Sequence, residues 1–416
     1  MKRLPRPLAI AIILIALVAL TPLVLPYSLL QPRLATHLTQ RLGSKVEIAD
    51  IGFSYLPTPA FSLKQVVIES PEAARVGSIE IPLSLHNVLF LGRELRGIRI
   101  RDAVLSRRFA VALPERIAPQ ADMARLGELQ LENIRLKMEP GEAGPFSGTL
   151  EFDPDGRIGQ LTLPSPDGKL TLTIQPAEPG AFAVQFAARN WQLPFAWPIE
   201  FDYVNLTGKA TGKALQITDI HVGLYQGVVT GAATLEWGRH WKLDGRIQAK
   251  NLHAEPLVAL FSPATRVSGL LEGEGHFAYE ADGYATLFDH PALQGHFTAR
   301  EGLLHNIDLI TPMKSQAAEA VHRGGQTRFD TLRGAFSLQN GTFSLRQLQL
   351  DTGKFRASGE LAIRRDRISG EAVSTLNAGL LTATSRFHLD GNLNAPELHS
   401  GSAWRPESPA AATLGE

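Results

Sequence analysis

The sequence predicts a mainly β chain, and three observations support this fold class. Apolar and polar residues alternate with a period of two along many short segments, from about residue 45 onward. Turn signals that contain glycine separate these segments, and segments with helical periodicity are few. Alternation of this kind places one face of a sheet against apolar material and the other face in water. We therefore expect one strand after another, joined by tight turns.

The alternating segments extend over most of the chain. In one of them, Ile79, Ile81 and Leu83 alternate with Glu80 and Pro82. Others lie at residues 95–101, 170–174, 215–224, 241–243, 336–350 and 361–363. The dipeptides Asp155-Gly156, Asp167-Gly168 and Asn340-Gly341 are hairpin signals, because a type I′ turn needs a positive φ at both central positions.

Composition excludes several classes of protein. The 416 residues include 41 Lys+Arg and 41 Asp+Glu, so the formal net charge is zero, and 44% of residues are hydrophobic. This balance argues against wholesale disorder and against a nucleic-acid partner. The chain has no cysteine, which excludes disulfides, thiol catalysis and Cys-based zinc sites.

The start of the chain predicts a membrane anchor. Lys2, Arg3 and Arg6 precede residues 8–25, which carry no charge. Extended to residue 30, this run is long enough to cross a bilayer of about 30 Å, with the basic flank on the cytoplasmic side. The alternative is a cleaved signal peptide, but no convincing small-x-small cleavage site lies between Leu20 and Gln31.

Helical patterns are short. Leu30, Leu34, Leu38 and Leu42 predict an amphipathic helix over residues 29–42, which ends at Gly43. We expect this helix to pack on its own domain, and the alternative is a helix at the membrane interface. Further helices are predicted at residues 255–261 and 312–322. Residues 187–200 show neither period and are interpreted as a junction, and the tail after residue 400 is predicted to be disordered.

In this order, these features resemble the AsmA family of bacterial envelope proteins. Near the start, the resemblance lies in residues 43–48 (GSKVEI), 61–68 (FSLKQVVI), 79–85 (IEIPLSL) and 91–98 (LGRELRGI). Further on, it lies in residues 267–273 (VSGLLEG), 293–297 (LQGHF), 301–309 (EGLLHNIDL), 329–341 (FDTLRGAFSLQNG) and 357–363 (ASGELAI). Residues 110–200 resemble no family, and the chain is short for an AsmA protein.

The resemblance implies a fold, a location and a function. The expected fold is a long curved antiparallel sheet that forms an apolar groove, with one N-terminal transmembrane helix and few short helices. The implied domains are a basic flank and anchor at 1–30, an N-terminal AsmA-like β module with the amphipathic helix at 31–190, a C-terminal AsmA-like module at 200–400 and the tail at 401–416. The expected location is the bacterial inner membrane, single-pass, with most of the chain in the periplasm.

The implied partner is membrane phospholipid, bound or conducted along the groove in outer-membrane biogenesis. A water-free apolar channel suits an acyl chain, since each CH₂ kept from water contributes about 0.8 kcal/mol. The groove candidates are alternating apolar residues: Leu206, Leu215, Ile217, Val222, Leu224, Leu235, Leu243, Ile247, Phe336, Leu338, Phe343, Leu345 and Phe355. From the residues alone, an ordinary filled core explains the same alternation.

Arg96, Arg99 and Arg101 are candidates for contact with anionic lipid headgroups. The alternative is a solvated strand face whose arginines pair with Glu94 and Asp102. Because no catalytic or metal-ligand motif occurs, we expect a non-enzymatic protein without cofactor or metal. A second hypothesis is an envelope scaffold, or a type II secretion component, that binds other envelope proteins and no lipid.

Overall fold

The computed structural model describes residues 27–56, 58–69, 74–89, 93–117, 125–137, 142–192, 199–259, 266–283, 286–314, 320–378 and 381–400. The predicted anchor at 8–30 lies outside these residues except for its last four, and the tail at 401–416 lies outside them entirely. Among the described residues, no helix has both the length and the apolar character needed to span a bilayer. The anchor therefore stays a prediction.

The chain divides into two compact units. Unit 1 runs to Phe186 and includes Lys209–Lys213, and unit 2 comprises Ala187–Gly208 and the chain from Ala214 onward. Strands dominate both units, the sheets are almost entirely antiparallel, and the helices are short, as the alternation predicted. The strands β11 (Ala181–Gln192) and β12 (Glu200–Thr211) carry residues of both units. Residues 187–192, predicted as a junction, continue β11.

Unit 1 is a sheet in which each strand pairs with the next. Its strands are β1 (Val46–Ser54), β2 (Ala60–Ile68), β3 (Ala74–Pro82), β5 (Ile98–Ser106), β7 (Glu128–Lys137), β8 (Glu142–Phe152), β9 (Ile158–Pro164) and β10 (Leu170–Glu178). All described pairs are antiparallel except β5 and β7, which are parallel. A separate parallel pair joins β4 (Glu94–Leu95) to β6 (Arg125–Leu126).

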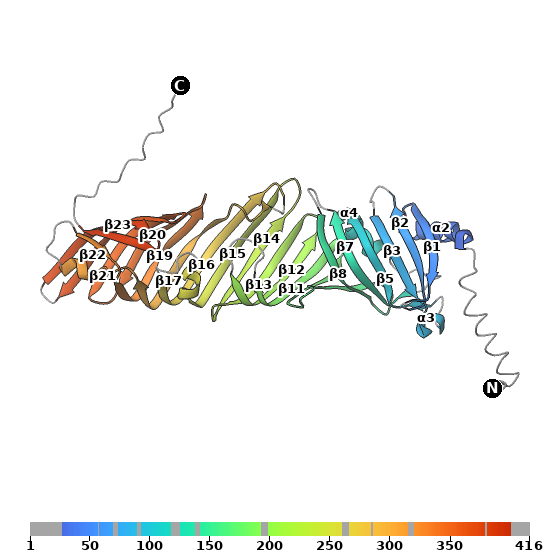
Figure 1. Ribbon diagram of the computed structural model, residues 1–416, viewed down its shortest axis with the longest axis horizontal. Coiled ribbons are helices and arrows are strands. Elements are labelled where there is room, and N and C mark those ends of the chain that lie inside the picture. The colour runs from blue at the N-terminus through green and yellow to red at the C-terminus, as the bar shows by residue number, and fades with distance from the viewer. Residues whose placement is uncertain are drawn as a thin grey trace, which may run out of the picture. The chain divides into compact units, whose positions relative to one another are not determined.

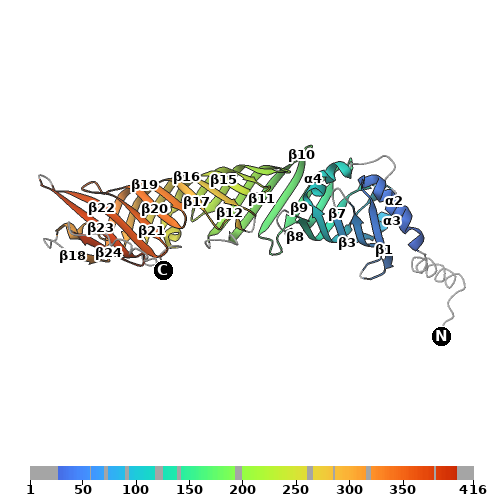
Figure 2. The ribbon, with the colours of Figure 1, turned by 90° about the horizontal axis from the view of Figure 1, so that it is seen from above.

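Two helices cover part of the apolar face of unit 1. In α2 (Gln31–Leu42), Leu38 and Leu42 pack against the buried Val46, Ile48 and Val66 of β1 and β2, and the helix lies beside β1 (Figure 2). Gly43 ends α2 with a φ of 62°, a conformation that glycine adopts without steric cost. The predicted helix is confirmed, and its packing on its own unit agrees with the first of the two interpretations.

The second covering helix, α4 (Arg107–Arg116), begins where the hydroxyl of Ser106 accepts a hydrogen bond from the backbone N–H of Phe109. Phe109 is buried against the same core. The helix crosses the sheet face between β5 and β7, and this crossover allows the two strands to be parallel.

Unit 2 is an antiparallel sheet that follows the order of the sequence (Figure 1). Its strands are β13 (Ala214–Leu224), β14 (Gly227–Glu236), β15 (Trp241–His253), β16 (Val267–Ala281), β17 (Ala292–His305), β19 (Gln326–Gln339), β20 (Thr342–Asp351), β21 (Phe355–Arg364), β22 (Arg367–Ala378), β23 (Leu381–Asn392) and β24 (Ala395–Ser400). The exception is β18 (Ala320–Arg323), which pairs with β24. The segment between β17 and β19 therefore reaches the far end of the sheet.

The helix predicted at 312–322 is wrong in its described parts. Thr311–Lys314 form a 3-10 turn, η3, and Ala320–Arg323 form β18. The carboxylate of Asp308 accepts the N–H groups of Ile310 and Thr311 and sets this turn. The edge of β24 then provides backbone partners for residues 320–323. The other predicted short helix is confirmed as α5 (Ala254–Ala259).

The hairpin prediction holds fully at one of three turns. Asn340 and Gly341 both have positive φ, at 50° and 69°, as a type I′ turn requires. At the other two turns Gly156 and Gly168 have positive φ, whereas Asp155 and Asp167 are not among the positive-φ residues. These two turns are therefore of another type, in which only the glycine needs the left-handed conformation.

Candidate functional site

The pairing register of unit 2 brings apolar residues from successive strands onto one face of the sheet. One row of cross-strand partners is Ile217, Ala233, Gly245, Phe277, Leu293, Leu338, Phe343 and Ile363. The next row is Ile220, Gly231, Ile247, Gly275, Gly295, Phe336, Leu345 and Leu361. We call the surface made by these rows and their same-face neighbours the apolar face.

All thirteen groove candidates lie on the apolar face. The pairings place Leu215, Leu235 and Leu243 in one further row and Val222 in another. Leu224 lies two residues after Val222, and Phe355 lies an even number of residues before Leu361, so both belong to the same face. Leu206 belongs to β12, where the neighbouring Tyr203 stacks on His221 of the opposite, polar face. Leu206 lies three residues after Tyr203, and an odd separation along a strand puts two side chains on opposite faces. Leu206 therefore lies on the apolar face.

The apolar face is buried in some places and partly open in others. Val222 and Leu224, near the end of β13, are buried, as are Leu252 and Leu338. In contrast, Leu215, Ile217, Leu235, Leu243 and Ile247 of β13–β15 are only half-buried, and so are Phe336, Phe343 and Leu345. The part of the face nearest these residues still has apolar surface to offer a ligand.

Glycines allow close approach of the backbone in the middle of the apolar face. A methyl group on Gly295 would lie 2.1 Å from the carbonyl oxygen of Glu274 and 2.8 Å from the ring of Phe336. A methyl group on Gly245 would lie 2.4 Å from the ring of Phe277. The aromatic rings therefore cover the glycines, and no side chain larger than hydrogen fits at these two positions.

Part of the apolar face, on β17 and β19–β24, is packed as a closed core, which we call the packed end. Phe329, Phe355 and Phe387 are at most 1% exposed and lie in one cluster with Leu350 and Leu398. Ile307, Leu309, Ile310 and Met313, from the segment that leads to β18, pack against the same cluster. Phe355 is therefore a core residue of this packed end and offers no surface to a ligand.

The opposite face of unit 2 is polar and carries a hollow of about 970 Å³. Its lining includes Arg246, Glu274, His276, His296 and Arg346, which alternate with the glycine row. Five residues of the second row also line it, and two of them are groove candidates: Gly231, Ile247, Gly275, Gly295 and Phe336. The hollow is therefore lined both by polar side chains and by residues of a row that belongs to the apolar face.

Sequence reasoning missed aromatic residues on the apolar face. Phe277, Phe297 and Tyr279 lie on it, although no residue of β16 or β17 was among the groove candidates. Burial raises the pKa of the Tyr279 phenol above its ordinary value, so its hydroxyl stays neutral. The alternation of Gly273, Gly275 and Phe277 in the sequence could have identified this strand.

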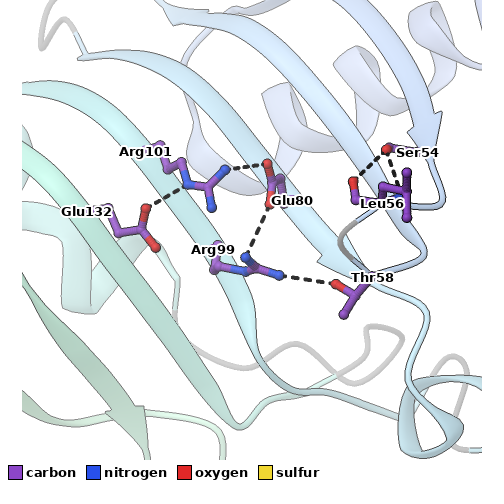
Figure 3. A network of polar contacts seen from close by, with 7 residues as sticks. All are labelled: Ser54, Leu56, Thr58, Glu80, Arg99, Arg101 and Glu132. Carbon is purple, nitrogen blue, oxygen red and sulfur yellow. Dashed lines mark hydrogen bonds and ion pairs between the residues drawn. The ribbon is translucent and has the colours of Figure 1, made fainter.

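The three arginine candidates in unit 1 are held by glutamates. The guanidinium of Arg101 donates to Glu80 and to Glu132, both at 2.7 Å, and Arg99 lies 3.8 Å from Glu80 (Figure 3). Arg96 donates to Glu94 at 2.6 Å. This hydrogen bond from Arg96 is the main reason that the pKa of Glu94 lies below its usual value. Arg96 has the most exposed side chain of the three, at 60%.

The chemistry that this arrangement supports is apolar binding. In the part of the chain that the structure describes, no three His, Asp or Glu side chains gather as metal ligands would. The half-buried residues of the apolar face carry no nucleophile and no proton donor apart from the Tyr279 phenol. The site thus defines a class of protein, namely a β-sheet protein with a partly open apolar face.

Comparison with known proteins finds a family match for part of the chain. Residues 203–348 match the model of the AsmA family, which confirms the resemblance over that range. The match begins in β12 and ends in β20, so it contains every groove candidate except Phe355. No curated protein and no solved structure matches the chain.

Proposed function

We propose that this chain is an inner-membrane protein with most of its length in the periplasm, and that the apolar face of unit 2 binds or conducts phospholipid in outer-membrane biogenesis. The observation that carries the proposal is the set of half-buried apolar rows from β12 to β20, within the segment that matches the AsmA family. AsmA is a bacterial envelope family, and the predicted anchor at residues 8–30 agrees with that location.

Acyl chains fit the apolar face energetically. Each CH₂ group that leaves water gains about 0.8 kcal/mol, so a lipid tail laid along several rows gains far more than any single contact provides. The strands follow one another at about 4.8 Å, so the rows continue from strand to strand across the sheet. Polar headgroups would remain outside the rows, where water solvates them.

The experiment is to purify the full chain in mild detergent and to quantify bound phospholipid by mass spectrometry. We expect lipid with the native chain and at least a tenfold loss with Leu215→Asp or Ile217→Asp, because a carboxylate in an apolar contact costs several kcal/mol. Gln216→Asp is the matched control: it adds the same charge to the same strand on the polar face. Equal lipid content in all four proteins would refute the proposal.

A second candidate is a scaffold that binds envelope proteins, such as a type II secretion component, and no lipid. The solid packing of Phe329, Phe355 and Phe387 favours a structural role for the end of unit 2. The same mass spectrometry separates the two candidates. A native chain that carries no lipid, but crosslinks to other membrane proteins through unit 2, would favour the scaffold.

A further inference from the structure

Large apolar side chains gather in water at one end of unit 1. Leu56 is 83% exposed in the hairpin between β1 and β2. In the short helix α3 (Leu85–Leu89), Leu85 is 76%, Val88 53% and Leu89 70% exposed. We call these four residues the apolar patch. Exposed apolar groups that lie close together mark interaction surfaces more often than single ones do.

The patch is held in place by buried hydrogen bonds. Asn87, at the centre of α3, is 2% exposed and donates to the carbonyls of Pro82 and Arg96. Its side-chain oxygen accepts the N–H of Arg96. The hydroxyl of Ser84 accepts the N–H of Asn87 at the start of the helix. The polar side chain of Asn87 thus faces inward while three apolar side chains are exposed, the reverse of an ordinary surface helix.

The hairpin and α3 lie at the same end of the sheet. Ala60, the first residue of β2, pairs with Pro82, the last residue of β3. The N–H of Leu83 donates to the carbonyl of Pro59 at 2.7 Å. Figure 3 shows Leu56 beside Ser54, whose hydroxyl donates to the Leu56 carbonyl at 2.8 Å. The two parts of the patch are therefore fixed to one another through β2 and β3.

Charged groups surround the patch. Arg93 and Arg96 follow α3 and are exposed, and Arg99 donates to Thr58 in the hairpin (Figure 3). The acidic groups that face them are Glu94, which pairs with Arg96 and lies 3.5 Å from His86, and Glu80, which pairs with Arg99. Three arginines against two glutamates leave a rim with an excess of positive charge.

The chain enters unit 1 at this same end. Tyr27, the first described residue, lies edge-on to Phe61 of β2, with ring centroids 6.1 Å apart. Phe61 pairs with Ile81, one residue before the end of β3. Leu29 and Leu30, beside Tyr27, are exposed. The predicted anchor therefore joins the unit on the side where the apolar patch lies.

From these observations we propose that the apolar patch inserts into the interface of an anionic bilayer, with Arg93 and Arg96 against the lipid headgroups. This inference rests on the proposed membrane location, but not on lipid binding by unit 2. A bilayer fits because apolar side chains enter the acyl boundary while a basic rim remains at the headgroups. The entry point of the predicted anchor brings the same bilayer to the patch.

The test uses the absence of cysteine, since a single introduced thiol takes a label at one position only. The full chain carrying Val88→Cys or Leu56→Cys is labelled with a polarity-sensitive fluorophore and reconstituted into vesicles of phosphatidylethanolamine and phosphatidylglycerol. The matched control is Glu69→Cys, an exposed position beyond the opposite end of β2. We expect blue-shifted emission and quenching by nitroxide-labelled lipid at Val88 and Leu56, and neither at Glu69.

Variants then separate the patch from the anchor. With the label at Leu56, Leu85→Ser/Leu89→Ser should lower quenching by about tenfold, because two leucines no longer enter the bilayer. Leu270→Ser/Val373→Ser removes two exposed apolar residues of unit 2 and should leave quenching unchanged. Arg93→Gln/Arg96→Gln should lower quenching in anionic vesicles and have little effect in pure phosphatidylcholine.

Labels at Val88 and Leu56 that remain as accessible to water as the label at Glu69 would overturn the inference. If lipid still co-purifies with the labelled chain in that case, only the insertion of the apolar patch is refuted and the proposed function stands. A chain that does not associate with vesicles at all would refute both the patch and the membrane location.

Discussion

At the scale of the residue, Asp308 shows how one carboxylate determines a local structure. Burial by itself would raise the pKa of Asp308, but hydrogen bonds from Thr311 and from the N–H of Ile310 outweigh it, so the pKa lies below its usual value. These bonds set the turn η3, from which Ile310 and Met313 reach the packed core. The sequence that follows this turn was interpreted instead as a helix over residues 312–322.

The direction of this pKa shift predicts the pH dependence of the turn. A lowered pKa in the folded state means that the stabilisation is complete above the ordinary carboxyl pKa and is lost as the pH falls through the folded value. Asp308→Ala should therefore weaken hydrogen-exchange protection of residues 309–313 by about 1 kcal/mol at pH 7. The difference should vanish at a pH below the folded pKa. An equal difference at both pH values would show that the charge is not involved.

At the scale of the element, the alternation predicted which residues share a face, because side chains on a strand have a strict period of two. All thirteen groove candidates lie on one face, although bulges interrupt the alternation, for example between Ile217 and Ile220 and between Leu345 and Leu348. The helix at 29–42 could also be predicted from the sequence, since its apolar residues pack on strands next in sequence. The structure of residues 312–322 could not be predicted in this way, because β18 forms only against β24, far along the chain.

The glycine positions predict a sharp difference between two glycine substitutions. Gly295→Ala should destabilise unit 2 by about 1–3 kcal/mol, because the new methyl group overlaps the Glu274 carbonyl and the sheet must shift. Gly238→Ala is the control, since no atom lies within 4 Å of the position of its methyl group. Denaturant unfolding of both proteins measures the difference. Equal stabilities would mean that the close approach at Gly295 is not required.

The packed end predicts that two phenylalanines of neighbouring strands act differently. Phe355→Ala should cost about 3–5 kcal/mol of unfolding free energy and leave lipid content unchanged in the protein that remains folded. Phe343→Ala, on the half-buried part of the same face, should cost less and lower lipid content. Thermal unfolding and lipid mass spectrometry on both variants test this division. If Phe355→Ala lost lipid and Phe343→Ala did not, the ligand would lie at the packed end, and the division would be contradicted.

At the scale of the whole molecule, the sequence predicted the class of fold and the composition of the apolar face, but not where that face is covered. Leu215 and Phe355 have the same character in the sequence, yet one is half-buried and the other is in a solid core. The difference depends on Ile307, Leu309 and Met313, which reach the core from a distant segment. Local periodicity contains no information about such contacts, so an open face and a filled core were both consistent with it.

The apolar patch of unit 1 was also beyond sequence reasoning. Leu85, Val88 and Leu89 resemble any short apolar run, and only the buried side chain of Asn87 shows that they point outward. The arginines nearby were identified, and so was Glu94, which pairs with Arg96, but Glu80 and Glu132 were not. Glu80 and Glu132 come from β3 and β7, on either side of the arginine strand β5.

The most direct test of the central claim, that acyl chains lie on the apolar face of unit 2, is photo-crosslinking at neighbouring positions of one strand. A benzophenone amino acid replaces Ile247 on the apolar face or Gln248 on the polar face, in cells, and adducts are identified by mass spectrometry. The account predicts phospholipid adducts at Ile247 and none at Gln248. Equal labelling at both positions, or none at Ile247, would contradict it.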